Sequence, residues 1–388
     1  MIAESFLFQI LLLLVLAKAL GRAFDLLSLP RVVGELLAGI ILGPSLLNLI
    51  TPREELEVLA ILGVVFFMMS AGLEIDLGRF IKYWRQGFII AVMGVVIPFT
   101  LGYCIGIAYG LDPIQCFSLG TALSITAIGL SVRVLMDLKM LRTRVGLAVI
   151  NAAIDDDVIG LILMSVAFSL AIEGSVAFHV TAFSVLSSAL FIGSGFLVTK
   201  YVCTHLRVRL FVDKYFRSPT SQLVLAISLA FLFGLLARVA SLHEIIGVFI
   251  AGMLLRGLLS WKVEGEIFDF TFAFFALLFF SYIGIKTDLR VITQISDLIL
   301  AVIVAAFVGK ILGGFLGAKI SRFTNGEALI VGIAMNSRAA VELAIASAFY
   351  SLGIFTLELF SAVVLMAAVT SITTPILLKL VAKYVTVT

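Results

Sequence analysis

The sequence predicts an all-α protein that crosses a membrane many times. Hydrophobic residues make up 62% of its 388 residues and charged residues only 13%, whereas a soluble domain is about 45–50% apolar and about 25% charged. The apolar residues form long unbroken runs instead of the short alternating segments of a transmembrane β-barrel. With so little polar surface the chain would not stay in water, which excludes soluble enzymes and nucleic-acid-binding proteins.

The apolar runs fit about thirteen membrane-spanning helices of about 20 residues each. The connections between them are short, and no soluble domain fits anywhere. The first run lacks a basic region and a small-residue cleavage site, so it is interpreted as a spanning helix and not as a signal peptide. The predicted helices lie near residues 4–24, 30–48, 56–75, 86–110, 114–136, 144–172, 178–203, 219–238, 241–258, 266–285, 293–320, 326–352 and 356–382.

The basic residues divide unevenly between the two sides of the membrane. With thirteen helices, one side receives only Arg53, Arg238, Lys286 and Arg290, and most other Lys and Arg residues fall on the opposite side. Cytoplasmic loops are enriched in basic residues, so the richer side is expected to be cytoplasmic. We therefore expect a multi-pass protein of the cell (inner) membrane, with its N-terminus outside and its C-terminus in the cytoplasm.

Two segments of the chain share a pattern of small residues. VVGELLAGIILGP at 32–44 aligns with IIGVFIAGMLLRG at 245–257. The first repeat also has Gly72, Asp76 and Leu77, which match Gly284, Asp288 and Leu289 in almost the same register as the first two segments. Gly120 matches Gly332 in that register as well. A shared register throughout favours a duplicated unit over chance similarity between glycine-rich helices.

The two copies would begin on opposite sides of the membrane, because the helix at 30–48 runs outward and the helix at 241–258 runs inward. This is an inverted-topology repeat, in which transport sites lie at the repeat interface near the membrane midplane. Repeat one is expected at about 28–172 and repeat two at about 219–382, joined by a linking helix at about 178–203.

Three consecutive acids, Asp155, Asp156 and Asp157, lie in the apolar stretch NAAIDDDVIGLILMSV. They fall roughly 20 Å along a helix that begins near Arg144, close to the membrane centre. Acids at this depth are costly and are functional candidates; one acid could form a structural ion pair, but three favour a function. Carboxylates bind hard cations, and burial beside another negative charge favours their protonated form. One site can then hold either a cation or protons, which is the basis of antiport.

Other charges and polar residues also fall within apolar runs. Lys310 has the Asp cluster as its partner at similar depth, in a structural salt bridge, a functional pair or both. Glu35 is expected near the cytoplasmic end of its helix, solvated or capping, and Arg133 is expected to extend towards the cytoplasmic interface.

Polar residues interrupt two predicted helices at matching positions of the repeat, which is typical of discontinuous helices that line a transport site. The hydroxyl groups could instead bond back to their own helix, and an Arg and a Glu four residues apart could form a structural pair. The residues concerned are Ser124 and Thr126 in the first repeat, and Asn336, Ser337, Arg338 and Glu342 in the second.

Five motifs occur in order across the whole chain: PRVVGELLAGIILGPSLL, ILGVVFFMMSAGLEIDL, the Asp-Asp helix, GKILGGFLGA and MNSRAAVELAI. With them the chain resembles the monovalent cation:proton antiporter-2 family, and in particular its NapA-type sodium/proton antiporters. The resemblance implies a thirteen-helix NhaA/NapA-like fold in which the broken helices 5 and 12 cross. It also implies a panel of helices 1–3 and 8–10 that forms a homodimer, and a mobile core of helices 4–6 and 11–13 that moves like an elevator.

The resemblance also assigns roles to the buried charges. In this family an Asp-Asp pair stands directly before two apolar residues and a glycine, which maps it onto Asp156 and Asp157. Asp157 would be the main carrier of cation and proton, and Asp156 would pair with Lys310. Two auxiliary residues depart from the pattern: relatives usually have an apolar residue in place of Asp155, and many carry the Glu two positions before Glu342.

The sequence therefore favours a secondary active transporter that exchanges sodium (or lithium) for protons in pH homeostasis. A potassium/proton antiporter of the same fold is the alternative, because both ions use the same oxygen ligands. An intramembrane aspartyl protease is disfavoured, because it would need aspartates on separate helices and the acids here are consecutive. A channel is disfavoured as well, because channels usually use rings of charge or carbonyls and the inverted repeat favours alternating access. We expect no enzyme activity, no cofactor and no nucleic-acid partner; the partners are monovalent cations, protons, lipid and a second copy of the chain.

Overall fold

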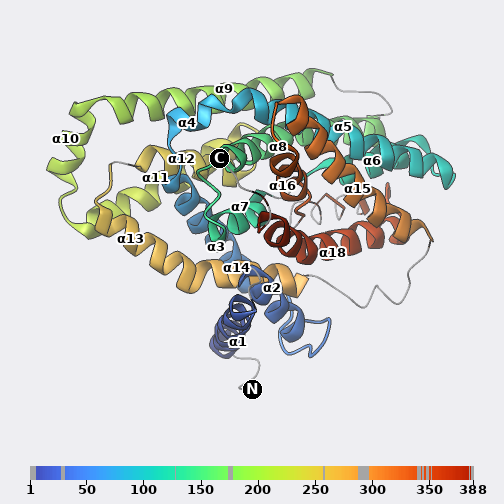
Figure 1. Ribbon diagram of the computed structural model, residues 1–388, viewed down its shortest axis with the longest axis horizontal. Coiled ribbons are helices and arrows are strands. Elements are labelled where there is room, and N and C mark those ends of the chain that lie inside the picture. The colour runs from blue at the N-terminus through green and yellow to red at the C-terminus, as the bar shows by residue number, and fades with distance from the viewer. Residues whose placement is uncertain are drawn as a thin grey trace. The chain divides into compact units, whose positions relative to one another are not determined.

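All regular elements of the described chain are helices, so the predicted all-α class is confirmed (Figure 1). Eight helical stretches in this part of the chain are long and apolar enough to cross a membrane. The count of thirteen helices and the crossing of two broken helices stay predictions. The computed structural model describes residues 6–27, 31–126, 128–173, 178–256, 258–286, 297–338, 342, 345–346, 349–350, 352–383 and 385.

The chain forms two compact units. Unit 1 comprises Met1–Pro52, Tyr83–Thr181 and Phe280–Thr388, and unit 2 comprises Arg53–Lys82 and Ala182–Phe279. The helices that lie wholly in unit 1 are α1 (Phe6–Leu26), α2 (Arg31–Leu42), α5 (Trp84–Ala108), α6 (Pro113–Ser124), α7 (Ile128–Asp137), α8 (Arg144–Glu173), α15 (Asp297–Ile320), α16 (Asn325–Met335) and α18 (Leu357–Ala382).

Unit 2 contains a second set of helices. Two helices belong to both units, because α9 (Phe178–Thr204) begins in unit 1 and α14 (Ala276–Lys286) ends there. The others are α3 (Glu54–Glu74), α4 (Leu77–Lys82), α10 (Leu206–Tyr215), α11 (Pro219–Val239), α12 (Glu244–Leu255), α13 (Trp261–Phe270) and the π-helical turn η1 (Thr271–Phe275). In unit 2 the Ser70 hydroxyl of α3 donates to Thr271 at 3.2 Å, and both residues are fully buried.

Glycines bring helix backbones together at equivalent positions of the two proposed repeats. In unit 1, a Cβ atom at Gly102 would lie 2.9 Å from the Cα atom of Gly120, which joins α5 to α6. In the same register of the second repeat, a Cβ atom at Gly314 would lie 2.8 Å from the Cα atom of Gly332, which joins α15 to α16. Because neither contact leaves room for a side chain, the matched glycines have a packing reason, and this supports a duplicated unit.

The pair of α2 with α1, which precedes the proposed start of repeat one, corresponds to the pair of α12 with α11 in repeat two. A Cβ atom at Gly34 would lie 2.6 Å from the carbonyl oxygen of Leu20, which packs α2 on α1. At the matching position of the second repeat, a Cβ atom at Gly247 would overlap the carbonyl oxygen of Phe233, which packs α12 on α11 in unit 2. The matched residues Asp288 and Leu289 lie outside the described residues.

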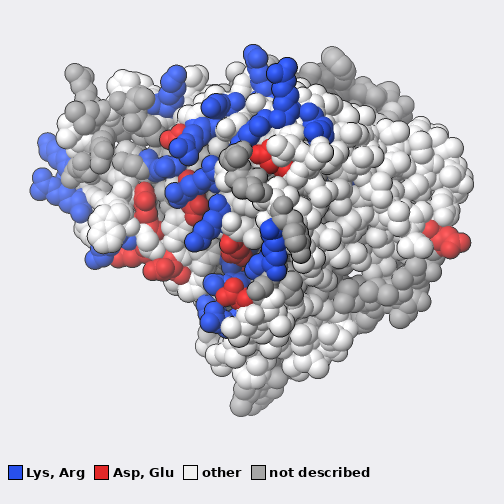
Figure 2. Space-filling model, in the orientation of Figure 1, with Lys and Arg blue, Asp and Glu red and all other residues white. Residues whose placement is uncertain are grey.

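The surface carries many exposed apolar side chains, which suits contact with lipid. Figure 2 shows wide uncharged areas on the face that it displays. In unit 2, Leu197 of α9 is 70% exposed and Leu235 of α11 is 60% exposed. Side chains of this size facing outward fit a hydrocarbon solvent better than water.

Candidate functional site

Two short helices of unit 1 end at equivalent positions of the chain. The helix α6 ends at Ser124 and α16 ends at Met335. Both begin with a capping box, formed by Asp112 with Gln115 and by Thr324 with Glu327, again in the register of the repeat. A capping box satisfies two of the free N–H groups at a helix start, so each short helix has a defined N-terminus, and its last carbonyls still need partners.

The first polar interruption is a break in the helix. Ile125 leaves α6 in an extended conformation, and α7 begins at Ile128. In the second repeat α16 ends before Asn336. Residues 339–341 lie outside the described residues, and they include Ala340, the position where many relatives are expected to carry the Glu.

The fully buried guanidinium group of Arg338 bonds to three backbone carbonyls at the break. It donates to the carbonyl oxygens of Ala122 at 3.1 Å and Ile125 at 2.8 Å, and also to that of Leu123. A positive charge at a helix C-terminus is favourable because it faces the negative end of the helix dipole. Arg338 therefore stabilises the end of α6 from the opposite repeat.

Hydroxyl groups from the segment that follows the break in the first repeat bond to the end of α16. The Thr126 hydroxyl donates to the carbonyl oxygen of Met335 at 3.2 Å, and the Ser131 hydroxyl of α7 donates to the carbonyl oxygen of Ala334. The last turn of α16 is thus held by the segment that follows the break in the first repeat. By contrast, the Ser124 hydroxyl bonds back to the carbonyl oxygen of Thr121 at 2.8 Å and makes a local contact.

Lys310 and Asp156 form an ion pair in the interior of unit 1. The Lys310 Nζ atom lies 2.9 Å from Asp156 Oδ1, and both side chains are 0% exposed. The same ammonium group donates to the carbonyl oxygen of Ser124, at the end of α6. Asp156 Oδ2 has no hydrogen-bond partner among the described residues. The pair therefore joins α15, α8 and the helix break, and it leaves one buried carboxylate oxygen available.

The other two acids of the cluster lie in different surroundings, and both are partly exposed. The charges of Asp156, Glu342 and Lys310 all act on Asp157. Within the described chain, Asp156 is the charged group that acts appreciably on Asp155. Asp157 is therefore coupled to the buried charges of unit 1, whereas Asp155 is coupled to its neighbour.

The remaining candidates of the second repeat are fully buried around the end of α16. Asn336 donates through Nδ2 to the Thr374 hydroxyl of α18 at 3.2 Å, and its Oδ1 atom has no partner among the described residues. Glu342 acts electrostatically on Arg338. Ser337 is buried beside them and has partners of its own.

Sequence reasoning missed a second buried ion pair in unit 1. Arg133 Nη2 of α7 lies 3.1 Å from Glu35 Oε1 of α2, and the two side chains are 5% and 4% exposed. The expectation that Glu35 is solvated or capping was therefore wrong. Arg133, which was expected to extend towards the cytoplasmic interface, is buried in this pair instead. The available signal was a Glu within an apolar helix together with an Arg one turn before the end of another.

The site presents an oxygen of the kind that small cations bind. Carboxylate oxygens are ligands that hard cations prefer, and Asp156 Oδ2 is a buried carboxylate oxygen with no hydrogen-bond partner among the described residues. In the described part of the chain, no group of three His, Cys, Asp or Glu residues is placed to hold a metal ion.

The fold and these buried charges define a polytopic membrane transport protein. The transmembrane sodium/hydrogen exchanger family matches residues 10–383 of the chain. The protein belongs to that family, which confirms the expected relationship at the level of the superfamily.

Relatives agree with this membership, and a solved structure shares the fold. The chain is 31% identical to the Na⁺/H⁺-K⁺ antiporter GerN of Bacillus cereus, over 97% of this chain and 96% of GerN. It is 30% identical to the probable Na⁺/H⁺ antiporter GerT of the same organism, over 96% and 98% of the two chains. The structure of the sodium proton antiporter MjNhaP1 from Methanocaldococcus jannaschii shares the fold, with a TM-score of 0.66 at 18% identity over 97% of both chains.

Proposed function

We propose that the protein exchanges sodium (or lithium) ions for protons across the cell membrane by alternating access. The observation that carries this proposal is the ion pair of Lys310 with Asp156, fully buried and next in sequence to the partly exposed Asp157. An unpaired charge would not persist in such surroundings, so the site must be neutralised by a proton, a cation or the lysine. The names of the relatives GerN and GerT support the choice of ions.

In the proposed cycle Asp157 is the main carrier, because it is partly exposed and lies in the field of Lys310 and Glu342. On the side with more protons, Asp157 is protonated and the pair of Asp156 with Lys310 is intact. On the other side a sodium ion binds the Asp157 carboxylate and the free oxygen of Asp156, and the proton leaves. If Lys310 also releases its proton when sodium binds Asp156, each cycle moves net charge.

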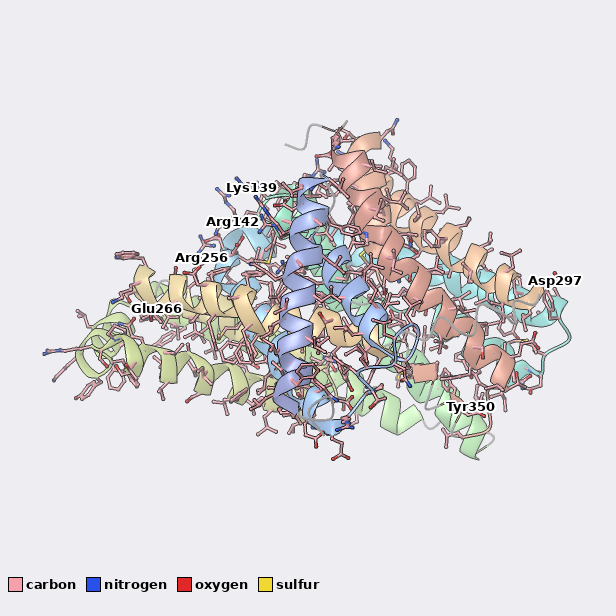
Figure 3. The ribbon with its side chains drawn as sticks, turned by 90° about the horizontal axis from the view of Figure 1, so that it is seen from below. Lys139, Arg142, Arg256, Glu266, Asp297 and Tyr350 are labelled. Atoms are coloured by element: carbon pink, nitrogen blue, oxygen red, sulfur yellow. The ribbon has the colours of Figure 1, made fainter. Side chains whose placement is uncertain are left out.

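The larger architecture is part of the proposal. The equivalent glycine contacts and capping boxes support two repeats. We place them in opposite orientation, with the helix break of each near the midplane. The mobile core would contain the predicted helices at 86–110, 114–136, 144–172, 293–320, 326–352 and 356–382. The panel would contain the predicted helices at 4–24, 30–48, 56–75, 219–238, 241–258 and 266–285, and it would form a homodimer. Figure 3 shows Lys139 and Arg142 together at one end of unit 1, away from Asp297 at the start of α15. This fits an orientation with the basic turn in the cytoplasm and Asp297 outside.

Potassium/proton exchange is the second candidate, and the name of the relative GerN favours it, because that name includes potassium as well as sodium. Both ions would bind the oxygens of Asp156 and Asp157, so the same residues would carry out either exchange. Selectivity would then depend on how closely these oxygens approach the ion.

The test is transport by the purified protein in proteoliposomes with an imposed pH gradient. Sodium, lithium and potassium are added in turn, and proton movement is followed with a pH-sensitive dye. We expect sodium and lithium to collapse the gradient. Collapse by potassium as well would support the second candidate. A gradient that survives all three cations would contradict exchange altogether.

A further inference from the structure

The Glu35–Arg133 ion pair has no part in the cycle proposed above. Arg133 Nε also lies 3.5 Å from Asp137 Oδ2, and the guanidinium group lies 5.8 Å from the centre of the Phe280 ring of α14. Moving two charges out of water carries a large desolvation penalty, so a pair this deeply buried is costly to keep as a mere staple. The pair joins α2 to α7, and these two helices differ in their other contacts.

The helix α7 is attached to the ion site. It follows the break whose Ser124 carbonyl meets Lys310. Two residues before Arg133, Ser131 bonds to the last turn of α16, and Thr126 makes a second bond to the same turn. Any movement of the broken helices therefore carries Arg133 with them.

The helix α2 is held by backbone contacts on its other sides. Gly34 packs on α1, and a Cβ atom at Gly39 would overlap the carbonyl oxygen of Ser281 in α14. The Ser281 hydroxyl also donates to the carbonyl oxygen of Glu35 at 3.1 Å. Close-packed backbones cannot slide past one another without a clash. Long charged side chains, by contrast, can separate and meet again, so the contact between α2 and α7 is suited to movement.

We propose that Glu35 is a positioning residue whose ion pair with Arg133 latches α7 to α2 in the conformation described here. The latch opens when the broken helices carry the ion across and closes when they return. This inference rests on the alternating access proposed above. Besides Arg133, the charged groups whose fields act on Glu35 are Asp137 of α7, Lys18 of α1 and Arg31 of α2.

Neutral variants separate a latch from a structural staple. Glu35→Gln and Arg133→Gln each strand a buried charge and should lower the melting temperature. The double variant Glu35→Gln/Arg133→Gln removes both charges and should regain most of that loss. If the pair is a latch, exchange by the stable double variant still differs from wild type. We expect its half-saturating sodium concentration in proteoliposomes to shift by at least about threefold, because the population of one conformation has changed.

Two further variants test the charge and its reach. Arg133→Lys keeps a positive charge on a side chain nearly as long, so it should leave half-saturation at the wild-type value. Glu35→Asp keeps the negative charge but shortens its reach, so it should shift half-saturation as the double variant does, even if the double variant does not fold. The matched control is Asp25→Asn, which removes exposed ion pairs to Arg22 and Arg31 on the same helix pair and should change nothing.

Wild-type melting and wild-type sodium half-saturation in the double variant, or in Glu35→Asp, would overturn the latch. So would an Arg133→Lys variant that behaves like the double neutral variant. These outcomes differ from a failure of the proposed function, in which the wild-type protein itself shows no cation-dependent proton movement.

Discussion

Each of the three consecutive acids has a different environment, although they share one turn of α8. Successive residues of a helix point about 100° apart, so all three cannot face one ion. Asp156 is fully buried and paired with Lys310, whereas Asp155 and Asp157 are partly exposed. Among these two, only Asp157 lies in the field of Lys310 and Glu342. The roles should therefore separate when the acids are changed one at a time.

Asp157→Asn should abolish cation/proton exchange and leave a folded protein. The amide keeps the shape of the carboxylate but can neither take up a proton nor offer a full negative charge. The measurement is exchange in proteoliposomes, with thermal melting as the check on folding. Asp155→Asn is the matched control, and it should retain exchange with at most a shifted pH optimum or apparent affinity. A dead Asp155→Asn protein beside an active Asp157→Asn protein would move the ion site to Asp155 and Asp156.

Lys310→Gln should lower the melting temperature and also stop exchange or make it independent of membrane potential. It leaves Asp156 without its cation, and breaking a buried pair by removing one partner costs about 3–5 kcal/mol, less where the acid takes up a proton. The double variant Lys310→Gln/Asp156→Asn should regain part of the stability. Unchanged melting together with unchanged voltage-dependent exchange would show that Lys310 is neither paired nor coupled.

At the scale of the elements, backbone contacts explain why so many glycines recur in one register. The helix α12 lies against α3 in unit 2, where a Cβ atom at Gly252 would overlap the carbonyl oxygen of Met69. The equivalent contact in unit 1 is that of Gly39 with Ser281, at the matching positions of the repeat. The recurring glycines of the two repeats are therefore explained by specific contacts between helix backbones and not by a general richness in glycine.

Gly252→Ala should destabilise the protein by about 1–3 kcal/mol, the usual cost of overpacking. Gly265→Ala in α13 is the matched control, because a Cβ atom there meets nothing within 4 Å. Alanine favours the helix over glycine by about 1 kcal/mol, so the control should be neutral or slightly stabilising. Thermal melting of the two variants in the same detergent gives the comparison. Equal melting temperatures would show that α3 and α12 are not in backbone contact at this point.

For the whole molecule, composition and hydrophobic run length were enough to predict the all-α membrane class. The shared register of the glycines predicted a duplicated unit, and the break after Ser124 was visible as a polar interruption. The partners of the buried charges could not all be predicted, because a pattern along one chain does not say which helices meet. The ion pair of Glu35 with Arg133 and the bonds of Arg338 to the end of α6 both join distant segments.

The orientation in the membrane can be tested with single cysteines in a chain whose Cys104, Cys116 and Cys203 are replaced by serine. Asp297→Cys should react with a membrane-impermeant maleimide in intact cells. Arg142→Cys should react only after the cells are permeabilised, because the basic turn is expected in the cytoplasm. The reverse pattern would invert the proposed topology.

The central claim is that the same carboxylates hold either a cation or a proton. The most direct test is proton release when sodium is added to the purified, detergent-solubilised protein in weakly buffered solution. Sodium should acidify the solution, with saturation, in wild type and in Asp155→Asn, and should release no protons from Asp157→Asn. Sodium binding without proton release, or release of equal size from Asp157→Asn, would contradict the account.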